Sequence, residues 1–166
     1  RAARISAGAH VRAIKHCRPG LREYHLEAEL LHEFRRHGSQ HVAYNSIVAA
    51  GSNTCILHHR AGNAELRDGD LCLIDAGCEL NGYASDITRT FPVNGKFSGP
   101  QRSIYEIVLA AQIAAIEKTK PGNVFTDPHD AAVHVITQGL IDLGIIKADS
   151  VANAIEQKLY QPYYMH

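Results

Sequence analysis

The stretch LCLIDAGCELNGYASDITRTF, residues 71–91, decides the fold of this chain. It contains two β-prone runs separated by Asn81-Gly82, a pair of residues that strongly indicates a two-residue hairpin turn. With such a turn, Asp75 lies opposite Thr88. A loop one residue longer or shorter would reverse the faces of one strand, and Gly77 could instead mark a bulge.

Two aspartates of this hairpin are expected on the same face. Asp75 and Asp86 become diagonal neighbours whose backbones lie within roughly 8 Å. Asp75 shares its face with Leu71 and Leu73, where two ionised carboxylates would repel each other and be costly to desolvate. Arg89 is nearby, but it points to the other face.

Two divalent cations roughly 3.5–4 Å apart would fit between the carboxylates. Hard oxygen ligands suit Mn²⁺ or Mg²⁺, and an added imidazole would admit Co²⁺ or Zn²⁺. The alternative is a pair of solvent-facing aspartates without a metal.

The rest of the chain alternates helices with short β-prone pieces. Apolar spacing and Pro or Gly stops predict helices at 1–17, 21–36, 99–118, 128–143 and 150–159. The β-prone pieces before the hairpin are SIVAAG (46–51) and CILHH (55–59).

One arrangement of helices and turns occurs twice. A helix, a Pro-Gly pair, a second helix and a closing glycine appear around Pro19-Gly20 and Gly38, and again around Pro121-Gly122 and Gly144. Strands follow the first copy, and almost nothing follows the second. The sequence therefore predicts a duplicated helix–helix–sheet unit whose second sheet is missing from this chain.

Composition excludes several classes of protein. The 166 residues are 45% hydrophobic and 20% charged, which is typical of a soluble globular domain. Lys+Arg and Asp+Glu both number 17, so the basic excess of a nucleic-acid-binding protein is absent. No apolar run approaches the ~20 residues of a membrane span. The four cysteines form no C-x-x-C pair and indicate reduced thiols of a cytoplasmic protein.

Histidines offer two further candidates. His58, at the end of CILHH, could hydrogen-bond a substrate near the metals, or it could be an ordinary surface histidine like His59. The run LHEFRRH is rejected as a zinc motif because His32 and His37 are five residues apart, whereas the H-E-x-x-H motif needs four.

Three strings carry a family resemblance: YNSIVAAGSNTCILHH (44–59), GDLCLIDAGCELNGYASDITRTFPVNGKF (69–97) and QRSIYEIVL (101–109). They closely resemble the catalytic domain of bacterial Xaa-Pro aminopeptidases (aminopeptidase P), in the creatinase, prolidase and methionine aminopeptidase superfamily. The resemblance implies an α+β pita-bread fold. Residues 1–166 would be a truncated catalytic domain, namely its first half plus the opening helices of its second half. The family's N-terminal domain and C-terminal ligand half would be absent.

The resemblance also implies a dinuclear metal site, usually of manganese. Asp75 matches the first aspartate ligand and Asp86 matches the aspartate that bridges the two ions. The remaining ligands, one histidine and two glutamates, would lie beyond residue 166, and one glutamate is the expected general base. The chain alone is therefore expected to be inactive.

Four more residues match positions near the family's site. His58 and His166 match histidines expected to bind the peptide or stabilise the tetrahedral intermediate. Tyr44 matches a position expected to contact the peptide, and Thr88 matches one that supports the metal ligands. The implied reaction is hydrolysis of an N-terminal Xaa-Pro peptide bond by a water activated by two metal ions. The alternatives are a prolidase, which prefers Xaa-Pro dipeptides, and a non-catalytic pita-bread module that binds peptides or proteins. Homo-oligomerisation stays open.

Overall fold

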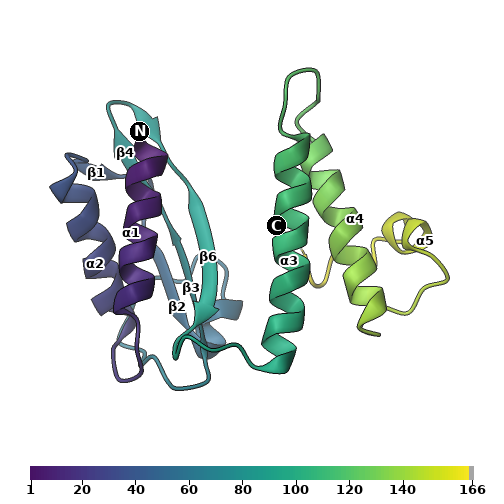
Figure 1. Ribbon diagram of the computed structural model, residues 1–166, viewed down its shortest axis with the longest axis horizontal. Coiled ribbons are helices and arrows are strands. Elements are labelled where there is room, and N and C mark those ends of the chain that lie inside the picture. Colours follow the sequence, from purple (N-terminus) through teal and green to yellow (C-terminus); the bar gives the residue numbers. More distant parts are fainter. Residues whose placement is uncertain (165–166) are drawn as a thin grey trace. The chain divides into compact units, whose positions relative to one another are not determined.

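The computed structural model describes residues 1–164. The chain divides into two compact units, Arg1–Phe97 and Ser98–His166. The first unit begins with two helices, which are followed by strands and a short 3₁₀ helix (Figure 1). Its elements are α1 (Ala2–His16), α2 (Glu23–Arg36), β1 (His41–Val42), β2 (Ile47–Ala50), η1 (Gly51–Cys55), β3 (Leu71–Ala76), β4 (Cys78–Leu80), β5 (Tyr83–Ala84) and β6 (Ile87–Pro92).

The predicted hairpin runs through both sheets of this unit. β3 lies between β2 and β6 in one antiparallel sheet, and β4 lies between β1 and β5 in the other. Asp75 pairs with Thr88, which confirms the predicted register. Asn81 and Gly82 have φ values of 55° and 83°, as a type I′ turn requires. The register is the same on both sides of Gly77, so no bulge residue is inserted there.

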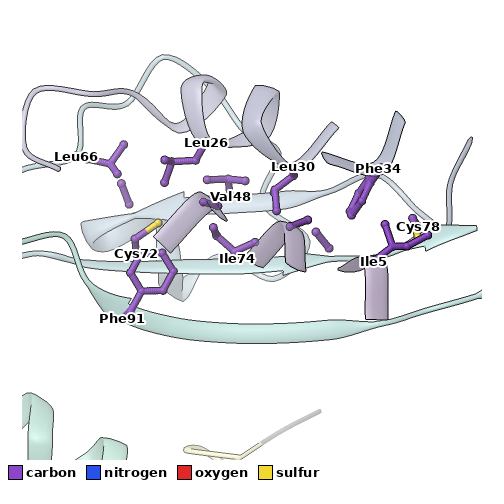
Figure 2. Close-up of a cluster of buried hydrophobic side chains, with 14 of the residues drawn as sticks. Ile5, Leu26, Leu30, Phe34, Val48, Leu66, Cys72, Ile74, Cys78 and Phe91 are labelled. Atoms are coloured by element: carbon purple, nitrogen blue, oxygen red, sulfur yellow. The ribbon is translucent and has the colours of Figure 1, made fainter. Parts of the chain in front are cut away.

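Helices α1 and α2 pack together against one face of the strands (Figure 1). Period-two alternation points Cys72, Ile74 and Ala76 of β3 into the core and leaves Leu71, Leu73 and Asp75 half-buried on the opposite face. Side chains of α2 meet those of β2 and β3 in this core (Figure 2). Its largest fully buried apolar members are Phe34, Leu26, Leu30, Leu66, Ile74 and Val48.

The predicted strand CILHH (55–59) is wrong. Gly51 turns the chain at φ 55° into η1, and residues 56–58 continue as a bend and a turn. Ile56 and Leu57 are 54% and 60% exposed. Their β propensity therefore does not decide the local structure, because no strand within residues 1–164 pairs with this segment.

The second unit contains α3 (Gly99–Lys118), α4 (Asp127–Asp142) and α5 (Val151–Glu156). Ser98 caps α3 in a reciprocal arrangement with Gln101. Helix α5 is shorter than the predicted 150–159, because Lys158 adopts a left-handed φ of 55° that ends it. Along residues 1–164, no helix combines the length and apolarity that a membrane crossing demands.

Both units show the predicted repeat of helix, Pro-Gly, helix and glycine. Gly20 and Gly122 follow the prolines at φ 89° and 93°. Gly38 and Gly144 follow the second helices at φ 90° and 69°. Within each unit the two helices pack against each other, as α1 with α2 and as α3 with α4.

One carboxylate lies inside the core of the first unit. Glu23, the first residue of α2, has an exposed fraction of 0%. Its carboxylate accepts four hydrogen bonds of 2.9 Å, from the backbone N–H groups of Ala50 and Gly62 and the side chains of Asn53 and His59. Burial acts to raise the pKa of Glu23, but these hydrogen bonds outweigh burial and hold the pKa below its ordinary value.

Glu23→Gln should lower stability at neutral pH and make stability less sensitive to acid. The folded pKa of Glu23 lies below its unfolded value near 4.3, so its ionised form contributes stability above about pH 4.3. That contribution disappears as the pH falls through the folded pKa. Urea unfolding at a series of pH values from 7 to 3 measures both effects. Glu106→Gln, at an exposed ion pair of α3, should follow the wild-type pH profile. Equal acid sensitivity of Glu23→Gln and wild type would contradict the expectation.

Candidate functional site

The carboxylates of Asp75 and Asp86 converge on one tyrosine hydroxyl. The Tyr44 hydroxyl oxygen lies 2.5 Å from Asp75 Oδ1 and 2.8 Å from Asp86 Oδ1. Tyr44 occupies the bend between β1 and β2, Asp75 is in β3, and Asp86 lies between β5 and β6. Three segments distant in sequence therefore meet at one point, with Asp75 half-buried and Asp86 exposed.

Backbone hydrogen bonds place Tyr44 beside the pair. Ile47 in β2 is the cross-strand partner of Asp75, so the chain just before β2 runs past that aspartate. The carbonyl of Gly77 accepts a 2.9 Å hydrogen bond from the N–H of Ala43. Tyr44 is thus held at both of its flanks by the chain around Asp75.

A close backbone approach sets the position of Asp86. A Cβ atom on Gly77 would lie 1.6 Å from the carbonyl oxygen of Ser85, so only glycine fits there. The Ser85 hydroxyl donates to the carbonyl of Cys78 at 2.9 Å and meets the Ser6 hydroxyl of α1 at 2.8 Å. This buried hydroxyl network fixes the strand that leads into Asp86 onto α1.

Tyr44 is a protonated donor to the pair. Burial, followed by the hydrogen bonds and negative charges of Asp75 and Asp86, raises the pKa of Tyr44 far above its ordinary value. One hydroxyl carries one proton, so it can donate to only one carboxylate at a time. No lysine or arginine within residues 1–164 forms an ion pair with Asp75 or Asp86.

Two converging carboxylates without a basic partner fit divalent cations. Their hard oxygen donors suit Mn²⁺ or Mg²⁺. Over the part of the chain that the structure describes, no group of three or more His, Cys, Asp or Glu side chains could hold a metal ion. Asp75 and Asp86 alone would therefore be too few side-chain ligands to hold a metal ion.

The other predicted site residues fall in different places. Thr88 is the cross-strand partner of Asp75, and its backbone carbonyl accepts a 2.7 Å hydrogen bond from Arg89. His58 lies on the loop after η1. That loop leaves the sheet after Ala50, which pairs with Cys72 and not with Asp75. The side chain of His58 is exposed. His166 lies outside the described residues. The structure thus joins Tyr44 to both aspartates, with Thr88 beside them.

Comparison with known proteins gives a consistent result. The sequence profile described as "Metallopeptidase family M24" matches residues 1–166. The Xaa-Pro aminopeptidase of Haemophilus influenzae is 55% identical over 165 residues, which are 99% of this chain and 38% of that protein. The Xaa-Pro aminopeptidase of Escherichia coli is 51% identical over 166 residues, which are 100% of this chain and 37% of that protein. The chain thus spans little more than a third of the length of these relatives.

Solved structures agree with these relatives. Pseudomonas aeruginosa aminopeptidase PepP has a TM-score of 0.94 and 56% identity, over 97% of this chain and 36% of that one. Proline aminopeptidase P II from Yersinia pestis has a TM-score of 0.93 and 52% identity, over 97% of this chain and 37% of that one. A zinc-substituted E. coli aminopeptidase P in complex with product has a TM-score of 0.93 and 51% identity, over 97% of this chain and 36% of that one. The predicted mixed α and β pita-bread fold is confirmed.

Proposed function

Since the chain belongs to metallopeptidase family M24, we propose that it forms part of an Xaa-Pro aminopeptidase, which removes an N-terminal residue that precedes proline. Its relatives at 55% and 51% identity carry that name. The observation that carries the proposal is the convergence of Asp75 and Asp86 on the Tyr44 hydroxyl. Such a pair of carboxylates is suited to hold two cations in a hydrolytic site.

Asp75 and Asp86 would hold two divalent ions, and we propose that both are Mn²⁺. When bound, two such ions act as a Lewis acid and lower the pKa of a coordinated water. A histidine and two glutamates, the remaining ligands, are proposed to follow residue 166 in the complete protein. A solved E. coli relative is zinc-substituted, which supports a site that accepts more than one divalent metal.

The other residues of this chain would orient the groups that react. Tyr44 keeps its proton and holds the carboxylates in place, and it borders the peptide. Thr88 supports Asp75 from the adjacent strand. His58 and His166 are proposed to bind the peptide or the developing oxyanion. The four cysteines are free thiols, which supports the proposed cytoplasmic location.

Tyr44→Phe should weaken metal binding by the complete protein. The variant keeps the ring but removes the hydroxyl that contacts both carboxylates. Loss of such an orienting partner costs about 10- to 100-fold in metal affinity or activity. Titration of the metal-free protein with Mn²⁺ in a calorimeter measures the change. Tyr83→Phe removes a hydroxyl from a side chain that is 76% exposed and should leave the affinity unchanged. Equal affinities of the Tyr44→Phe and Tyr83→Phe proteins would exclude this role for Tyr44.

A substrate comparison tests the proposed function. The complete protein, loaded with Mn²⁺, should release the first residue from Xaa-Pro-Yaa peptides and do so faster than it cleaves Xaa-Pro dipeptides. A preference for dipeptides would favour the prolidase alternative. Peptide binding without cleavage or Mn²⁺ binding would favour the non-catalytic module. The 166-residue chain alone should not turn over either substrate.

A further inference from the structure

The buried carboxylate of Glu23 connects the segments that flank a candidate substrate-binding histidine. The four groups that donate to it belong to the end of β2, to η1 and to the loop that follows η1. In chain order these donors are Ala50, Asn53, His59 and Gly62. The chain between the second and third of them carries His58.

The loop over residues 56–65 contains little regular structure, so hydrogen bonds to neighbouring segments contribute much of what orders it. Its far end is attached to the start of α2, where Glu23 N–H donates to the carbonyl of Ala64 at 3.1 Å and Tyr24 N–H donates to that of Gly62 at 3.3 Å. The backbone of Glu23 thus holds one end of the loop, and its carboxylate binds the loop at His59 and Gly62.

The two adjacent histidines of this loop have different environments. His59 Nε2 donates to Glu23 Oε2 at 2.9 Å, and the His59 side chain is 17% exposed. His58 is exposed and has a left-handed φ of 54°, a conformation that persists when the surrounding structure imposes it. The inward His59 therefore fixes the backbone that presents His58 outward.

We propose that Glu23 is a positioning residue for His58. Its carboxylate, through His59, Asn53 and two backbone N–H groups, fixes the loop in the conformation from which His58 reaches the peptide. This inference rests on the proposed function only in the role of His58. The order of the loop itself can be measured without substrate or metal.

Two substitutions separate positioning from general stability. Glu23→Gln keeps the length of the side chain, but its amide nitrogen cannot accept the two bonds now made to one carboxylate oxygen. His59→Ala keeps the carboxylate and its other three donors, so it serves where Glu23→Gln fails to fold. His37→Ala is the matched control, because its 2.8 Å bond to Glu33 lies on the exposed surface of α2.

The experiment is a double-mutant cycle in the complete protein, with hydrogen exchange as an independent measurement. Glu23→Gln should lower kcat/KM for an Xaa-Pro-Yaa peptide by about 10- to 100-fold, as loss of a supporting hydrogen-bond partner does elsewhere. His59→Ala should lower it several-fold. In protein that already carries His58→Ala, neither Glu23→Gln nor His59→Ala should lower kcat/KM further. Effects of residues that act through one another are not additive. Amide exchange should accelerate over residues 53–62 and stay slow in β3.

Two results would overturn the proposal. One is a loss of kcat/KM in the Glu23→Gln or His59→Ala protein that persists in full in the His58→Ala background, which would show a structural role independent of His58. The other is unchanged exchange over residues 53–62 in both variants. If the wild-type protein cleaves no Xaa-Pro peptide, the proposed function fails, and the exchange measurement alone then decides whether Glu23 positions the loop.

Discussion

Gly77→Ala should destabilise the protein by about 3 kcal/mol or more and abolish the convergence of the two aspartates. The new Cβ would lie 1.6 Å from the carbonyl oxygen and 2.5 Å from the carbonyl carbon of Ser85. Both are backbone atoms of the opposite strand, so no side chain can rotate away to make room. The strands must separate, and Asp86 follows Ser85 directly.

The same substitution would displace Tyr44. The carbonyl of Gly77 accepts the hydrogen bond from Ala43, the residue before Tyr44. A shift at this glycine is therefore transmitted to all three members of the site. Denaturant unfolding measures the loss of stability, and Mn²⁺ titration of the complete protein measures the loss of the site.

Gly8→Ala is the control for Gly77→Ala. Gly8 lies on the exposed side of α1, where a Cβ would meet one side-chain oxygen of Glu33 at 3.9 Å. Alanine is a better helix former than glycine by roughly 0.5–1 kcal/mol, so this variant should gain stability. A Gly77→Ala protein as stable as wild type would show that the hairpin tolerates a wider strand separation than the structure has.

The hairpin could be predicted from sequence because its rules are local. A two-residue turn sets the register, and a side-chain period of two then places Asp75 and Asp86 on one face. Helices α1 to α4 were predicted within one or two residues, since their Pro and Gly stops adopt the conformations that end helices.

Features that depend on distant segments could not be predicted in the same way. The run CILHH has strand propensity but no strand beside it. That Tyr44 bonds to both aspartates follows from the path of the chain before β2, which no periodicity encodes. The roles of His58, His166 and Thr88 in substrate binding or support stay predictions.

Glu23 was missed although the sequence contains a signal for it. On a helix it falls on the same stripe as Leu26, Leu30 and Phe34, all of which are buried. A charged residue on the apolar stripe of a helix must find hydrogen-bond partners when that stripe is buried. The sequence could have indicated a buried carboxylate there, but the four donors come from residues 50–62, whose arrangement depends on the tertiary fold.

Asp86→Asn should reduce the activity of the complete protein on the order of 10³-fold and prevent it from binding its full complement of metal. Asparagine keeps the size of the side chain and one carbonyl oxygen but removes the negative charge. Metal ions contribute several kcal/mol to charge stabilisation in hydrolysis, and each 1.36 kcal/mol is tenfold in rate. Asp75→Asn should have the same effect, because its carboxylate converges on the same point.

The effect of Asp86→Asn on the melting temperature should depend on whether metal is bound. In metal-free protein, Asp86→Asn removes the repulsion between two carboxylates and should leave the melting temperature equal or higher. Added Mn²⁺ should raise the melting temperature of wild type by mass action and raise that of the variant far less. Thermal unfolding with and without Mn²⁺ measures both effects.

Asp68→Asn is the control. Asp68 lies at an exposed turn and accepts a hydrogen bond from Asn94, so this variant should keep the wild-type response to metal. A full response of the Asp86→Asn protein to Mn²⁺ would rule out Asp86 as a metal ligand.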